Sequence, residues 1–251
     1  MSHKFLVSVI ALIISLASTL AEGNTLPIPK QKWSFDGPTG TFKKDALQRG
    51  YQVFKEVCSA CHGLNWISYQ KLMSIGLSKN TVKALAAEHE QPDLNDDGQP
   101  IQRKGIISDK IHSPYANDKA ARASNNGALP PDLSLITKAR PDGSNYVYAL
   151  ITGYCAAPTD TPITEGMHYN PYFSGRQIAM AAPLFEGQVK YADGTKATID
   201  QMAKDVVTFL SWAAEPEMEQ RKQMGVKVIF YLLILTIVLY FSKRKIWKNV
   251  K

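Results

Sequence analysis

The chain has 251 residues, of which 29 are lysine or arginine and 22 are aspartate or glutamate, so its formal net charge is +7. Hydrophobic residues make up 45% and aromatic residues 10%, which excludes a disordered chain, because such chains lack the apolar surface that offsets the entropy of ordering. The mean hydropathy of −0.19 excludes a protein with many membrane spans. The length leaves room for one large domain or two small ones.

The excess positive charge is confined to the two ends of the chain. All acidic residues lie between Glu22 and Glu219, and of the 29 basic residues one precedes and six follow the segment 22–226, whose net charge is therefore zero. A protein that binds DNA or RNA shows a basic face on its folded domain. We therefore expect no nucleic-acid partner.

Residues 1–21 have the features of a secretory signal peptide. A long apolar stretch follows Lys4, and the small residues Thr19 and Ala21 precede the expected cleavage site. Such a segment directs the rest of the chain out of the cytoplasm. An uncleaved N-terminal anchor is the alternative.

The C-terminal region predicts a membrane anchor. Val228–Phe241 is a run of 14 uncharged, mostly apolar residues, and Met224–Val226 extends it across Lys227, whose long side chain can reach the membrane surface. The usable length is about 18 residues, close to the roughly 20 that a span needs. We expect an anchor helix at 221–242 and a basic tail at 243–251, which should stay in the cytoplasm. A buried core helix is the alternative.

Residues 58–62 have the C-x-x-C-H pattern of a c-type haem attachment site. Residues three apart share a face of a helix, so the thiols of Cys58 and Cys61 can reach the two vinyl groups on one haem edge, while His62 binds the iron. A thioredoxin-like redox pair, a zinc site and a structural disulfide are the alternatives. A zinc site needs further ligands, whereas Cys155 stands alone and the other histidines are scattered. We expect one covalent haem c, and Cys155 as a small buried apolar residue.

The second axial ligand of such a haem sets its potential, and a methionine raises it. Met167 and Met180 lie in a stretch rich in proline and glycine, 153–187, that has little helical periodicity. The residues around Met180 are small, so a flat ring can approach that backbone closely. His168 could also bind iron. This chemistry favours Met180 and leaves Met167 and His168 as alternatives.

The remaining pattern predicts a mostly α-helical domain, residues 22–220, with long loops. One amphipathic helix over 45–61 leads into the haem motif. Another over 198–213 begins with a capping box of Thr198 and Gln201, and we expect the two helices to pack together. Shorter helices are predicted at 80–89 and 144–152, and a short hairpin strand at 188–191.

The segment 88–98 carries five acidic residues together with Pro92 and Gly98, which predicts a solvated loop. A docking patch for a basic redox partner is the functional alternative, because complementary charge speeds the encounter between proteins.

Several stretches of the chain match one known family: 49–62, 121–123, 125–134, 152–155, 169–173, 203–206 and 212–217. The stretch from Asn125 to Ser134, together with the predicted anchor, is far more specific than the C-x-x-C-H motif. On these stretches the chain resembles the cytochrome c1 family, the haem c subunits of ubiquinol–cytochrome c reductase. The resemblance runs from about Trp33 to the C-terminus.

The resemblance implies a class I c-type cytochrome-like haem domain with one C-terminal transmembrane helix. It also implies residues for the covalent bonds, for the iron and for a haem propionate. These are Cys58 and Cys61 for the thioether bonds, His62 and Met180 as axial ligands, and Arg140, Tyr146 and Asn125 on the propionate side.

By the same resemblance, the chain would take electrons from a Rieske iron–sulfur protein and pass them to a cytochrome c, beside cytochrome b in a dimeric complex. It would not be an enzyme on its own, since the cofactor carries the reaction. The haem domain would lie on the periplasmic side of a bacterial inner membrane, with the C-terminus in the cytoplasm.

Two other functions stay open. One is a free-standing, membrane-tethered electron shuttle to an oxidase, and the other is a haem c enzyme or sensor with an open iron position. His62 and Met180 lie 118 positions apart, and the chain between them offers more surface than a small shuttle needs. A methionine bound to the iron argues against the enzyme or sensor function, because it fills the position where a substrate or gas would bind.

Overall fold

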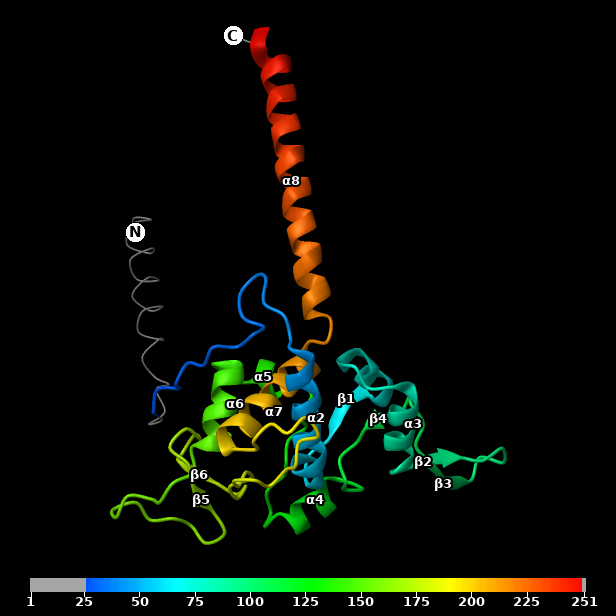
Figure 1. Cartoon of the computed structure of the whole chain (residues 1–251), viewed down its shortest axis with the longest axis vertical. Helices are drawn as coiled ribbons and strands as arrows, with labels where there is room; N and C mark the ends of the chain where they lie inside the picture. Colours follow the sequence, from blue (N-terminus) through cyan, green and yellow to red (C-terminus); the bar gives the residue numbers. More distant parts are fainter. Residues whose placement is uncertain (1–25, 250–251) are drawn as a thin grey trace, which may run out of the picture.

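The computed structural model describes residues 26–249, so the predicted signal peptide lies outside the described residues. Figure 1 shows a largely helical domain from which one long helix, α8 (Met218–Ile246), projects. The other helices are α2 (Lys44–Glu56), α3 (Lys79–Ala87), α4 (Asp118–Ser124), α5 (Ile136–Ala139), α6 (Gly143–Thr152) and α7 (Ile199–Ala214), with 3-10 helices η1 (Cys58–Ala60), η2 (Tyr69–Ile75) and η3 (Trp247–Asn249). The mostly α fold is confirmed, and α3 and α6 confirm the two shorter predicted helices.

The strands of the described chain are short and pair in twos. None of the three pairs extends into a larger sheet, so the core is built mainly by the helices. The antiparallel pairs are β1 (Leu64–Ser68) with β4 (Lys110–Ile111), β2 (Glu90–Leu94) with β3 (Pro100–Lys104), and β5 (His168–Tyr169) with β6 (Gln177–Ile178).

The centre of the core is the contact between α2 and α7. A Cβ at Gly50 would lie 2.0 Å from the carbonyl oxygen of Asp205, so a glycine is needed for the two backbones to approach this closely. The Phe209 ring packs against Tyr51 and Phe54, with ring centroids 5.5 and 5.8 Å apart. The predicted packing of the two amphipathic helices is confirmed.

A buried ion pair also joins these helices. Arg49 Nε lies 2.9 Å from Asp205 Oδ2, and Arg49 Nη1 lies 2.7 Å from Asp193 Oδ2. The amide of Gln201 donates to the same Asp205 carboxylate at 2.9 Å. Only half of the predicted capping box forms, because Thr198 Oγ1 accepts the N–H of Gln201 while the Gln201 side chain binds Asp205 instead.

The helix α8 leaves the domain and makes the long projection in Figure 1. With η3 it forms a continuous helical segment, Met218–Asn249, whose most apolar window has a hydropathy of 2.3 and is 0% buried within the protein. The alternative of a buried core helix is therefore wrong, and α8 is long and apolar enough to cross a membrane. The helix continues through most of the predicted basic tail.

Three local predictions are wrong. No strand forms at 188–191, because Val189 and Tyr191 bury their side chains in the core without a partner strand. The acidic segment 88–98 is not a plain loop, since it contains β2 of a hairpin. Cys155 is exposed, because it lies in an irregular segment beyond the end of α6.

Candidate haem site

The C-x-x-C-H segment directly follows α2. That helix ends at Glu56, and the chain then tightens into η1, where the N–H groups of Cys61 and His62 donate to the Cys58 carbonyl at 3.1 and 2.9 Å. A 3-10 turn has three residues per turn, so side chains at i and i+3 align. This local geometry brings the thiols of Cys58 and Cys61 close together, as a two-point attachment requires.

Both cysteines are free, half-buried thiols. Burial raises the pKa of Cys58 to about 12, and the neighbouring Cys61 adds to the effect. Within residues 26–249, no three His, Cys, Asp or Glu side chains gather as metal ligands, so the described residues offer no zinc site around Cys58 and Cys61.

The imidazole of His62 is held in a defined orientation. Its Nδ1 lies 2.7 Å from the backbone carbonyl oxygen of Pro131. A carbonyl can only accept, so Nδ1 carries the proton and Nε2 presents its lone pair. Burial lowers the pKa of His62, more than the contact with Pro131 raises it, and the ring stays neutral. A neutral, oriented imidazole is the form that binds a metal.

The segment that carries this carbonyl is fixed to the chain that follows the motif. The N–H of Leu133 donates to the Gly63 carbonyl at 3.0 Å. The carboxylate of Asp132 accepts the N–H of Asn65 at 2.7 Å and that of Ser134 at 2.9 Å. These contacts hold the segment 131–134 against the residues that follow the motif.

The leading candidate for the second axial ligand, Met180, is half-buried in the loop after β6. Its carbonyl oxygen accepts a hydrogen bond from the Tyr154 hydroxyl at 2.9 Å. His168 is exposed and pairs in β5 opposite Ile178, which makes it a poor ligand for a buried iron. Met167 is half-buried and lies just before the same strand. Tyr154 lies in the matching stretch 152–155, but nothing in the sequence predicted its contact with Met180.

Arg140 and Tyr146 lie together, next to Tyr154. Arg140 follows α5, and Tyr146 is in the first turn of α6. Burial raises the pKa of Tyr146, and the nearby Arg140 guanidinium opposes this effect. Burial also raises the pKa of Tyr154 above its usual range, with a smaller contribution from Tyr146. The structure thus connects Arg140, Tyr146 and Tyr154 with Met180.

Asn125 belongs to a different group. It caps the C-terminal end of α4, and its amide nitrogen donates to the Tyr115 hydroxyl at 3.0 Å and to the Ala121 carbonyl at 2.6 Å. Both N–H donors of the amide are therefore engaged within the protein. Asn125 thus contacts Tyr115 in the segment before α4, whereas Arg140 and Tyr146 lie near Tyr154 and Met180.

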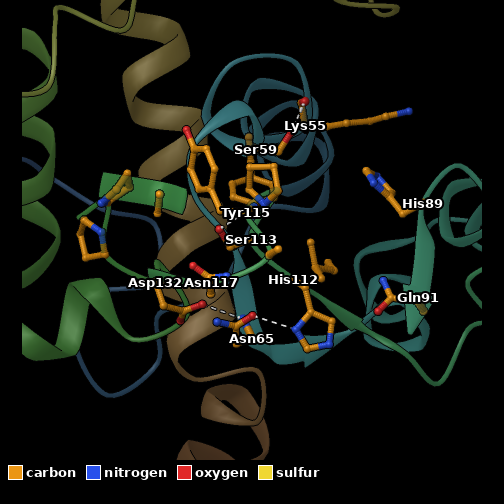
Figure 2. A pocket seen from close by; sticks show the side chains of 18 of the residues that line it. Lys55, Ser59, Asn65, His89, Gln91, His112, Ser113, Tyr115, Asn117 and Asp132 are labelled. Atoms are coloured by element: carbon orange, nitrogen blue, oxygen red, sulfur yellow. Dashed lines mark hydrogen bonds between the residues drawn. The ribbon is translucent and has the colours of Figure 1, made fainter. Parts of the chain in front are cut away.

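A cavity of about 840 Å³ lies beside the motif, and Figure 2 shows side chains that line it. Ser59 of the motif and Pro131 line it, and so does His112, whose Nδ1 lies 3.0 Å from Asn65 Oδ1. The two motif cysteines, His62 and Met180 do not line it. This cavity is therefore a neighbour of the candidate haem site.

A helical domain with paired thiols at a helix end, an oriented neutral histidine and a projecting apolar helix is typical of a membrane-anchored c-type cytochrome. Residues 33–250 match the model of the Cytochrome C1 family, and the chain belongs to this family of haem-containing electron-transfer proteins. The predicted family is thereby confirmed.

Relatives from bacteria and from mitochondria cover most of the chain. The cytochrome c1 of Rhodospirillum rubrum is 45% identical over 257 residues, covering 96% of this chain and 94% of the relative. The mitochondrial cytochrome c1 heme protein of Saccharomyces cerevisiae is 46% identical, covering 94% of this chain and 76% of the relative. A Candida albicans protein named as the catalytic subunit of the mitochondrial cytochrome b-c1 complex is 46% identical, covering 94% and 82%.

Proposed function

We propose that this chain is the haem c electron-transfer subunit of a ubiquinol–cytochrome c reductase. The observation that carries the proposal is the contact between His62 Nδ1 and the Pro131 carbonyl, directly after two aligned thiols. It leaves Nε2 as an iron ligand where Cys58 and Cys61 would hold a porphyrin edge. The names of the relatives support the same function, since one of them is named as a subunit of a cytochrome b-c1 complex.

The residues present suit one covalently bound haem c. Thiols three residues apart would form its thioether bonds, and the imidazole of His62 with a thioether sulfur would form its axial pair. When bound, the haem supplies a one-electron iron couple, which a methionine ligand holds at high potential. The proposed residues are Cys58 and Cys61 for the covalent bonds, and His62 and Met180 for the iron.

Arg140 and Tyr146 would bind a haem propionate. A guanidinium pairs well with a carboxylate, and the Tyr146 hydroxyl lies beside that of Tyr154 near Met180. Arg140 is exposed, as a residue at the edge of a haem cleft would be. Asn125, whose amide donates to the Tyr115 hydroxyl, is proposed as a further neighbour of the propionate.

The electron would arrive from a Rieske iron–sulfur protein and leave to a cytochrome c, with cytochrome b as the neighbouring subunit in a dimeric complex. None of the chain's side chains would do bond chemistry, so the chain is not an enzyme on its own. Its residues bind and orient the haem and present surfaces to partner proteins.

We also propose the topology. Residues 1–21 would be a signal peptide, 22–220 the exported haem domain, 221–242 the membrane anchor and 243–251 a basic tail. The last turn of α8 holds Lys243, Arg244 and Lys245, which supports a cytoplasmic C-terminus. The haem domain would then lie on the periplasmic side of a bacterial inner membrane.

Purification through a C-terminal tag tests the proposal. We expect b-type haems and an iron–sulfur cluster to co-purify with the haem c of this chain in mild detergent. Recovery of the chain as a single-subunit haem protein would favour a free-standing shuttle instead. Rapid binding of carbon monoxide to the reduced haem c would indicate an open iron position, as in an enzyme or sensor.

A further inference from the structure

Met180 lies in the long connection between α6 and α7, where the regular structure within the described chain is limited to the short pair β5–β6. A thioether is a weak ligand, so its place on an iron depends on how firmly the surrounding backbone is held. One side-chain contact reaches this backbone at Met180 itself: the hydroxyl of Tyr154 donates to the Met180 carbonyl at 2.9 Å.

Tyr154 itself comes from a firmly packed position. Gly153 ends α6, and a Cβ there would lie 2.5 Å from both the Ala149 carbonyl oxygen and the Tyr172 ring, so a glycine is required for this turn. Tyr154 is half-buried. The packing around Gly153 thus fixes the position of the Tyr154 hydroxyl, which donates to Met180.

The same end of α6 also holds the loop that precedes Met180. Asn170 is fully buried, and its amide donates to the Leu150 carbonyl at 2.7 Å. Its N–H donates to the Arg176 carbonyl at 3.0 Å, which closes the turn before β6. Two side-chain hydrogen bonds therefore tie the segment 170–180 to the C-terminal end of α6 and the residues directly after it. The one from Tyr154 contacts Met180 itself.

We propose that Tyr154 is a positioning residue for the axial ligand, and that its hydrogen bond to the Met180 carbonyl keeps the thioether on the iron and the sixth position closed. Because Tyr154 also lies beside Tyr146, the packing of α6 links the propionate side of the site to the ligand loop. This inference rests on the proposed function, since it takes Met180 as the ligand.

The test is Tyr154→Phe in the full-length, haem-loaded protein, with imidazole as a competing ligand for the ferric iron. One hydrogen bond contributes about 1 kcal/mol to holding the loop, so without it imidazole should bind about fivefold more tightly than in the parent. The matched control is Tyr172→Phe, which removes a hydroxyl of the same kind from the same loop and should change the affinity less than twofold. A haem-stained denaturing gel checks that the haem stays attached in each variant.

Equal imidazole affinity in the parent, Tyr154→Phe and Tyr172→Phe would overturn the inference. Replacing Tyr154 with 3-fluorotyrosine gives a second measurement that preserves the ring, and the more acidic donor should weaken imidazole binding. No change with that residue would count against the inference as well. A parent protein that lacks the near-infrared band of a thioether-bound ferric haem would instead show that Met180 is not the ligand, which is a failure of the proposed function.

Discussion

Lys222 Nζ, in the second turn of α8, donates to the backbone carbonyl of Phe35 at 2.7 Å, across 187 positions of sequence. The same ammonium donates to the Gly40 carbonyl at 3.0 Å, and Glu219 accepts the N–H of Phe42 at 2.7 Å. The segment before α2 thus packs against the first two turns of α8 (Figure 1). The predicted domain boundary at residue 220 falls inside this contact region, so the first two turns of α8 pack as part of the domain.

We expect Lys222→Met to lower the free energy of unfolding of the haem domain by about 2 kcal/mol, because hydrogen bonds to charged groups contribute about 1.5–3 kcal/mol each. The measurement is urea unfolding of the full chain in detergent, followed by haem absorbance. Lys83→Met, at an exposed position of α3, is the control and should change stability by less than about 0.5 kcal/mol. Equal effects of the two substitutions would show that the contact at the foot of α8 does not hold the domain.

The Arg49–Asp205 pair gives a second prediction. Asp205 is 2% exposed, so removing its carboxylate leaves Arg49 partly uncompensated within the protein. We expect Asp205→Ala to destabilise the domain by about 3–5 kcal/mol. Asp45→Ala removes a 63% exposed carboxylate 3.5 Å from the same guanidinium and should cost less than about 0.5 kcal/mol. Similar losses for the two variants would contradict the role assigned to the buried pair.

Acid stability follows from the carboxylates of this network. The N–H of Thr195 and the Arg49 guanidinium lower the pKa of Asp193 to about 2. In the unfolded chain the group titrates near pH 3.9, so its contribution is complete above about pH 4 and is lost as the pH falls toward 2. The free energy of unfolding should therefore decrease over this window, and less steeply in Asp193→Asn. Identical slopes in urea titrations at pH 5, 4 and 3 would contradict this assignment.

The sequence could show features that depend on neighbouring residues. The spacing of Cys58, Cys61 and His62 predicts haem attachment, and that assignment stays a prediction. The apolar stripes around Gly50 and Val206 predicted two helices that the structure contains. Contacts between distant loops left no such pattern. The Pro131 carbonyl lies 69 positions from His62, and no spacing rule connects them.

The failed predictions have a related cause. The alternation of apolar residues at Val189 and Tyr191 indicates that both side chains are buried. A helix-rich core can bury them without pairing the segment as a strand. The β2–β3 hairpin was missed because its strands are almost entirely exposed and carry charges, which resembles a loop. Tyr154 was missed because its partner is a backbone carbonyl, which any residue possesses.

The acidic hairpin gives a further prediction. It projects from the side of the domain in Figure 1, and Asp93 pairs with Arg103, which also contacts Asp109 at 2.7 Å. Asp96 and Asp97 lie in the exposed turn between the strands. We expect Asp96→Asn with Asp97→Asn to slow reduction of a basic cytochrome c at low salt and to flatten the salt dependence. Asp93→Asn should have a smaller effect, since its charge is already compensated.

Stopped-flow kinetics over a range of ionic strength make this measurement. Unchanged rates at low ionic strength in the double variant would assign the hairpin no part in docking.

The central claim is that Met180 is the axial ligand that makes this chain an electron carrier, and a redox titration of Met180→Lys beside Met167→Lys tests it most directly. Cys58 and Cys61 are unchanged in both variants, so the haem should stay covalently attached. Loss of the thioether should lower the potential of Met180→Lys by an amount on the order of hundreds of millivolts. Each decrease of about 59 mV weakens a one-electron reduction tenfold, so electron transfer from the donor should stop. A large drop in Met167→Lys, with an unchanged potential in Met180→Lys, would contradict the account.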